Sequence, residues 1–554
     1  MNTLNLSARR AFTFGALAIA VISYPELVRA QDTQPPAGEP GATPTPDQPA
    51  PAPAPAQPAA APAAPTEAQQ AAPAAKPEEH NAAGAPAAGQ APSVEATPVT
   101  APPRQRPDQS QPRSWFYRAP LTLDVGTDGE HWGITFYGSL SADLIHDDTR
   151  SFNEKIGSNV VQRRETFEGR SGRTQFSSRS TKIGLKLESP ELGGVRPSAV
   201  VVFGFGGEST ETTTPPQISE GSYYSSPQVA MQSAYLSLGS DYVDVLVGLT
   251  NDLFGWQSYY APCSIQSLGL PNEAHSRHTQ VRISHTFGVE SPFGVGIGIA
   301  ASRPAQRDSE VPDGQGGLQL NLNSWKGITT PGALGTVALP LSIGVSGIVR
   351  RFKVNAFTFP PVQNANEATG WGVSLDALVP VIPADNADDR GNKLTLTGSF
   401  TTGTGIADMI TAGGGARFPT LPNPAQANPP PIYTPDIDNG LVTFDTLGVL
   451  HTIDWQTFMV GLQYYLPPTG RLIFSANYTE GFSMNMADLY PQGGIEIELQ
   501  GRVAKRQRYA DANLLFDVTP AIRAGISLQW VQTTYVDGDK PDNLREMVKL
   551  AYVF

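Results

Sequence analysis

The sequence predicts an all-β protein, a transmembrane antiparallel β-barrel preceded by a disordered Pro/Ala-rich segment. Three observations support this fold class. Apolar and polar residues alternate in strand-length stretches from Trp132 to the C-terminus. Some of these stretches are joined by short turns and others by long loops rich in Gly, Pro, Asn and Asp. The last stretch is again alternating and ends on Phe554, as a strand that closes a barrel would.

The first element in the chain, residues 1–30, has the organisation of a signal peptide. Arg9 and Arg10 precede an apolar stretch over residues 11–23, and small residues lie just before the expected cleavage site after Ala30. The two arginines also resemble a twin-arginine export signal. We favour an ordinary secretory signal, because the rest of the chain is typical of a protein exported unfolded.

Residues 31–113 form the second element, a predicted disordered periplasmic linker. Of these 83 residues, 21 are Pro and 24 are Ala. Such a composition lacks the aromatic and branched residues that could offset the entropy of ordering the chain. The linker is either a tether that reaches toward the cell wall or a tail without a specific partner.

Composition excludes several classes for the remaining element, residues 114–554. From residue 115 onward, 31 Lys and Arg stand against 42 Asp and Glu, a net charge of −11, which excludes a nucleic-acid binder. No apolar run reaches the ~18 residues of a membrane-spanning helix. Cys263 is the single cysteine, so neither an intrachain disulfide nor a cysteine-based metal cluster can form.

No residue pattern predicts catalysis, a cofactor or a bound metal. His275 and His278 lie close together, but their spacing matches no metal motif. The other histidines lie near no nucleophile motif, and the glycines at 413–415 follow no strand-to-helix pattern. We therefore expect no enzyme and no cofactor.

The period-two pattern predicts individual strands. It is clearest at residues 134–144, 182–188, 243–249, 295–301, 318–322, 394–400, 472–478 and 495–499. A soluble β-sandwich also alternates, but here the second face carries charged or very small residues, as a water-filled lumen requires. Short turns at 465–470 and 517–520 contrast with a long loop at 401–440. This asymmetry is typical of an outer-membrane barrel.

The length predicts the strand number, and the C-terminus predicts an assembly signal. Sixteen strands leave roughly 27 residues for each strand with its connection, while eighteen remain compatible with the length. One face of the last strand carries the apolar side chains expected to be recognised by the barrel-assembly machinery, Val548, Leu550, Tyr552 and Phe554.

Several strand motifs resemble the DcaP-type outer-membrane porin family of Gram-negative bacteria. They lie at residues 133–138, 142–143, 180–186, 234–239, 247–254 and 279–283. The resemblance implies a sixteen-stranded homotrimeric channel that admits small anionic solutes such as dicarboxylates. Family members often carry a periplasmic coiled coil before the barrel; the Pro/Ala-rich linker takes its place here, which puts a trimer contact through the tail in doubt.

Candidate pore-lining residues follow from the alternation. Residues opposite the lipid-facing positions form a predicted cationic ladder for carboxylates, namely Lys182, Lys186, Arg282 and Arg350. The alternative is a lumen without net preference, in which acidic residues such as Glu496 and Glu498 balance these cations. A cluster of arginines at 163–179 is expected to fold inward, to contact lipopolysaccharide phosphates, or to stay in a solvated loop.

The function expected from these features is an outer-membrane porin that lets small hydrophilic solutes diffuse passively. Its expected partners are outer-membrane lipid and lipopolysaccharide, further copies of the chain in a homotrimer, and no nucleic acid. The alternative is a structural or adhesive outer-membrane barrel, tethered to the cell wall and with a plugged lumen. The two differ in where the long loops fold, which the sequence does not determine.

Overall fold

The structure, a computed structural model, describes residues 121–127, 130–157, 159–207, 228–266, 269–333, 335–355, 365–411, 437–444, 449–489 and 503–554. The predicted signal peptide and linker lie outside the described residues. So do the start of the predicted barrel at 114–120, the predicted strand at 495–499 with Glu496 and Glu498, and most of the predicted loop at 401–440. No helix in the described ranges is long and apolar enough to cross a bilayer.

Strands dominate the described chain. In order they are β1 (Leu121–Thr127), β2 (Glu130–Asp147), β3 (Arg173–Ser177), β4 (Lys182–Glu188), β5 (Arg196–Gly207), β6 (Gln228–Gly239), β7 (Asp244–Asn251), β8 (Arg277–Phe287), β9 (Phe293–Ser302), β10 (Asp313–Thr329), β11 (Val337–Asn355), β12 (Ala365–Ile382), β13 (Lys393–Thr404), β14 (Val442–Phe444), β15 (Leu450–Thr452), β16 (Asp454–Tyr465), β17 (Leu472–Ser483), β18 (Ala504–Asp517), β19 (Ile522–Tyr535) and β20 (Asp542–Val553). The helices within the described ranges are single turns: α3 (Phe167–Arg170), α5 (Met486–Leu489), η2 (Phe254–Trp256), η3 (Arg307–Ser309), η4 (Pro331–Ala333) and η5 (Ala407–Met409).

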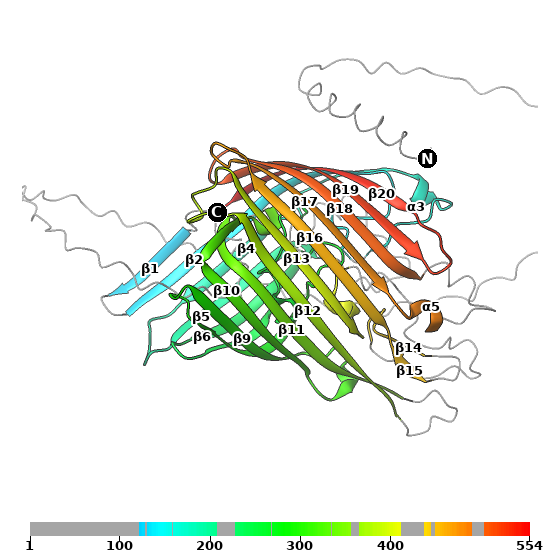
Figure 1. Ribbon diagram of the computed structural model, residues 1–554, viewed down its shortest axis with the longest axis horizontal. Helices are drawn as coiled ribbons and strands as arrows, with labels where there is room; N and C mark the ends of the chain where they lie inside the picture. The colour runs from blue at the N-terminus through cyan, green and yellow to red at the C-terminus, as the bar shows by residue number, and fades with distance from the viewer. Residues whose placement is uncertain are drawn as a thin grey trace, which may run out of the picture. The chain divides into compact units, whose positions relative to one another are not determined.

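The wall strands pair antiparallel with their neighbours and close on themselves (Figure 1). Closure is made by β2 and β20, with Leu140 opposite Tyr552. Strands β3 and β4 both pair with β2 and together occupy one position in the wall. Strand β1 pairs only with the start of β2, outside the circle. The described residues therefore form a closed 16-strand barrel, and the alternative of eighteen is wrong.

The two faces of the wall differ in polarity. On β20, the side chains of Val548, Leu550 and Tyr552 are exposed on the outer face, whereas the alternate residues Met547, Lys549 and Ala551 are buried. The other wall strands repeat this arrangement, with Ile183, Val281, Ile283, Ile343 and Val345 among the exposed apolar residues. The predicted alternation is confirmed, because an apolar outer face suits lipid and a polar inner face suits water.

The connections are short at one rim of the barrel. The turns predicted at 465–470 and 517–520 join β16 to β17 and β18 to β19. The chain also ends at this rim, where the backbone of Phe554 makes two hydrogen bonds with that of Gly138 (2.9 and 3.1 Å). The predicted loop at 401–440 begins later than expected. Residues 401–404 continue β13, because β-branched and small residues keep its ladder with β16 intact.

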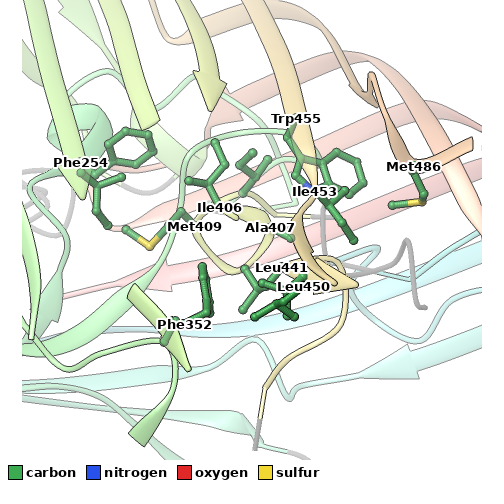
Figure 2. Packing of buried hydrophobic residues seen from close by; sticks show 14 of the residues in the cluster. Phe254, Phe352, Ile406, Ala407, Met409, Leu441, Leu450, Ile453, Trp455 and Met486 are labelled. Atoms are coloured by element: carbon green, nitrogen blue, oxygen red, sulfur yellow. The ribbon is translucent and has the colours of Figure 1, made fainter. Parts of the chain in front are cut away.

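Long connections from the opposite rim fold into the barrel. Residues 405–411 and the β14–β15 hairpin pack inside the wall of β11, as Figure 2 shows for Phe352, Ile406, Met409 and Leu441. An interior of this width cannot be filled by wall side chains alone, so inward segments supply the apolar core.

Candidate functional site

The described residues between β7 and β8, 252–266 and 269–276, form an inward segment that contacts the inner side of the wall. It first contacts β11, where the Gly255 amide donates to Ser346 Oγ (2.7 Å). Tyr260 Oη lies 2.7 Å from Ser342 Oγ. Burial raises the pKa of Tyr260, so this phenol stays protonated. The first half of the inward segment is therefore attached to the wall by neutral hydrogen bonds.

The middle of the inward segment contacts wall strands from the C-terminal part of the chain, β17 and β20. Asn477 Nδ2 on β17 donates to the Cys263 carbonyl (2.8 Å). Lys549 Nζ on β20 donates to the Ile265 carbonyl (3.0 Å). Burial raises the pKa of the Cys263 thiol to about 12, so this cysteine is a protonated core residue.

A carboxylate joins the two ends of the inward segment. Asp252 Oδ2 accepts a hydrogen bond from Ser276 Oγ (2.6 Å) and lies 2.6 Å from His278 Nδ1. Of the two neighbouring histidines considered in the sequence, His278 belongs to β8 and binds Asp252, while His275 lies in the inward segment. Within the described ranges, no three His, Cys, Asp or Glu side chains lie together as metal ligands would.

The connection at 148–172, described except for residue 158, carries most of the predicted arginine cluster and also folds inward. Its apolar side chains pack with Leu270 of the inward segment and with wall residues, forming the buried cluster Phe152, Ile156, Val161, Leu270, Tyr509 and Val531. Arg545 on β20 holds this connection, since it pairs with Asp147 (2.8 Å) and donates to the Glu154 carbonyl (3.1 Å).

Most of the clustered arginines are paired. Arg163 binds Asp537 (2.7 Å), Arg164 binds Asp542 (3.2 Å) and Arg179 binds Glu154 (3.3 Å). These ion pairs attach the connection at 148–172 to the rim and wall. Their charges are therefore largely compensated within the protein.

Four other basic side chains lie close enough for their charges to interact where these elements meet. Lys155 lies in the connection at 148–172, Lys182 on β4, Arg277 at the start of β8 and Lys549 on β20. The charges of Lys155, Arg277 and Lys549 all act on Lys182. The pKa of Lys155 is lowered, first by the protein groups that surround its ammonium and then by the charges of Arg277 and Lys549. Part of the Lys155 side chain is nevertheless exposed to water. We call these four residues the cationic cluster.

The cationic cluster is only partly neutralised. Lys549 lies 3.6 Å from Asp143. Neither Lys155 nor Arg277 forms an ion pair with any residue that the structure describes. Arg277 instead donates to the Asn251 side chain (3.0 Å) and lies 3.3 Å from His275 Nε2. Lys155 and Arg277 therefore contribute positive charge that no ion pair within the described residues compensates.

The structure places the predicted ladder residues on the inner face but in different surroundings. Lys182 belongs to the cationic cluster. Lys186 pairs with Glu188 (2.8 Å), and Arg282 donates to Gln280 Oε1 (2.9 Å). Arg350 is buried between two carboxylates, Asp313 (2.6 Å) and Asp408, which compensate its charge.

Sequence reasoning missed three members of the cationic cluster. Lys549 lies on the inner face of the last strand. Its position next to the outward-facing Leu550 in the alternating pattern could have predicted this. Arg277 sits between the two histidines considered as metal ligands. Lys155 carries no signal, since the alternation stops before the loop that contains it.

The closed wall, apolar outside and polar inside, is the fold of an outer-membrane porin. Among solved structures, the chain is similar to the outer membrane channel DcaP of Acinetobacter baumannii, with 15% identity, 77% of this chain and 99% of that chain covered, and a TM-score of 0.53. It is also similar to the anion-selective porin from Comamonas acidovorans (10% identity, 76% and 100% covered, TM-score 0.42). At such identities the likeness concerns the fold. No family model and no curated protein matches the sequence.

Proposed function

We propose that the protein is an outer-membrane porin through which small hydrophilic solutes diffuse, with a preference for anions. The cationic cluster is the observation that carries this proposal. Charges of one sign on a narrow, water-filled passage concentrate ions of the opposite sign. The net charge of −11 from residue 115 onward does not oppose this, because solutes respond to the charges that line their path.

The finer proposal is a DcaP-type homotrimer that admits dicarboxylates. It is supported by the strand motifs and by the similar fold of the Acinetobacter baumannii channel. Two carboxylates on one solute would complement cations that come from separate elements, such as Lys155 and Arg277.

The competing function is a structural or adhesive barrel with a plugged lumen. It is favoured by the inward connections, whose apolar side chains occupy part of the interior in two clusters. This function predicts no measurable solute flux, whereas a porin must conduct ions. Single-channel conductance of the purified protein in planar bilayers separates the two.

Reversal potentials under a salt gradient test the anion preference. Lys155→Glu should lower the anion-to-cation permeability ratio by roughly twofold or more, most strongly at low ionic strength. Lys540→Glu, an exposed charge reversal in the connection between β19 and β20, is the matched control and should leave the ratio unchanged. The double variant Lys186→Glu and Arg282→Glu tests the predicted ladder separately. A wild-type channel that prefers cations, or a Lys155→Glu channel with wild-type selectivity, would refute the proposal.

A further inference from the structure

A small polar cavity lies between the inward segment and the barrel wall. Gln257, Ser258, Tyr260 and Glu273 of the inward segment line it, together with Asp376 on β12 and Ser399 on β13. Its free space corresponds to about one water-sized particle. The cavity is therefore too small for a solute but suits a water molecule or a single ion.

Two carboxylates face this cavity without a compensating charge. Glu273 is 6% exposed and Asp376 is 2% exposed. Neither forms an ion pair with a described residue, and the charge of Glu273 acts unfavourably on Asp376. Glu273 accepts hydrogen bonds from the backbone amides of Leu270 (2.8 Å) and Gly269, and Asp376 accepts one from Ser374 Oγ (3.0 Å). Two buried negative charges at one cavity are strongly unfavourable unless a cation or a proton compensates them.

A hydroxyl at the same cavity gives an independent indication of a ligand. The Ser258 side chain is 8% exposed and has no hydrogen-bond partner in the part of the chain that the structure describes. Its backbone adopts a positive φ of 69°, which is uncommon for a residue other than glycine. A buried hydroxyl normally finds a partner, so its presence here points to a ligand in the cavity.

We propose that this cavity binds a divalent metal cation, for which Ca²⁺ is the best match, through Glu273, Asp376 and Ser258. Ca²⁺ takes oxygen ligands only, and carboxylate, hydroxyl, main-chain carbonyl and water oxygens are its usual set. The bound ion would link the inward segment to β12 and so hold the segment against the wall. This site goes beyond the proposed function and does not depend on which solutes pass.

Calcium binding to the full-length, refolded protein tests the proposal. After treatment with a chelator, titration with CaCl₂ in a calorimeter should show one saturable site. Asp376→Asn and Glu273→Gln keep the side-chain shapes while removing one charge each, and each should weaken Ca²⁺ binding at least tenfold. Tb³⁺, excited through nearby aromatic residues such as Tyr260, should emit in the wild type and be displaced by Ca²⁺.

Glu290→Gln, in the exposed turn between β8 and β9, is the matched control and should bind Ca²⁺ as the wild type does. Heat-modifiable migration on gels confirms that each variant forms a barrel. The proposal is overturned if the wild type shows no saturable Ca²⁺ binding, or if folded Asp376→Asn and Glu273→Gln bind as tightly as the wild type. Conductance is measured separately, so failure of this site leaves the proposed porin function intact.

Discussion

Replacing Arg545 by Met should release the connection at 148–172 from the barrel interior. Arg545 and Asp147 have fully buried side chains, and the guanidinium binds both carboxylate oxygens at 2.8 and 2.9 Å. The same guanidinium donates to the Glu154 carbonyl and lies over the Phe152 ring, 5.6 Å from its centroid. One side chain thus joins β20, the end of β2 and the inward connection.

The expected cost follows from this geometry. Removing one partner of a buried ion pair leaves an uncompensated charge and costs about 3–5 kcal/mol. Asn543, which donates to Asp147 (2.8 Å), cannot replace the lost positive charge. The double variant Arg545→Met and Asp147→Asn removes both charges and should recover a large part of the loss.

Equilibrium urea unfolding in lipid vesicles, followed by tryptophan fluorescence, measures this free energy. Arg351→Met is the matched control, because Arg351 pairs with Glu367 on the exposed side of β11 and β12. An exposed pair contributes at most about 1 kcal/mol. If Arg545→Met costs no more than Arg351→Met, the assignment of Arg545 as the anchor of the connection is wrong.

Three further predictions concern pH, assembly and the linker. Burial raises the pKa of Glu273 to about 7 from an ordinary 4.5. With divalent cations removed by a chelator, the free energy of unfolding should therefore fall as pH rises between these two values, by on the order of 3 kcal/mol. Glu273→Gln should abolish this pH dependence. Deleting Phe554 should lower the yield of folded barrel in outer-membrane fractions; a normal yield would contradict the assembly-signal interpretation. Deleting residues 32–106 should leave folding and conductance unchanged, since a disordered spacer adds no core, and a loss of either would reveal a structural role.

The face of the wall on which a residue lies could be predicted from the sequence. Whether other residues compensate its charge could not. The alternation assigns Arg350 to the polar face of its strand, and in the structure its side chain on β11 is buried. Its neutralisation depends on Asp313 and Asp408, which lie on β10 and in a different inward connection. No local pattern links these three residues, so the sequence could not separate a compensated arginine from one available to solutes.

The sequence by itself determined the barrel class and the polarity of each face, and it favoured sixteen strands while leaving eighteen open. These properties depend on the chain length and on period-two alternation. Each strand carries the alternation within its own residues. Only the tertiary structure decided which connections fold inward and which cations gather. Lys155, Lys182, Arg277 and Lys549 meet because the closed wall brings β20 beside β2 and turns separate loops into one interior. The cluster thus joins residues from separate parts of the chain, and its geometry is set by the register around the whole ring.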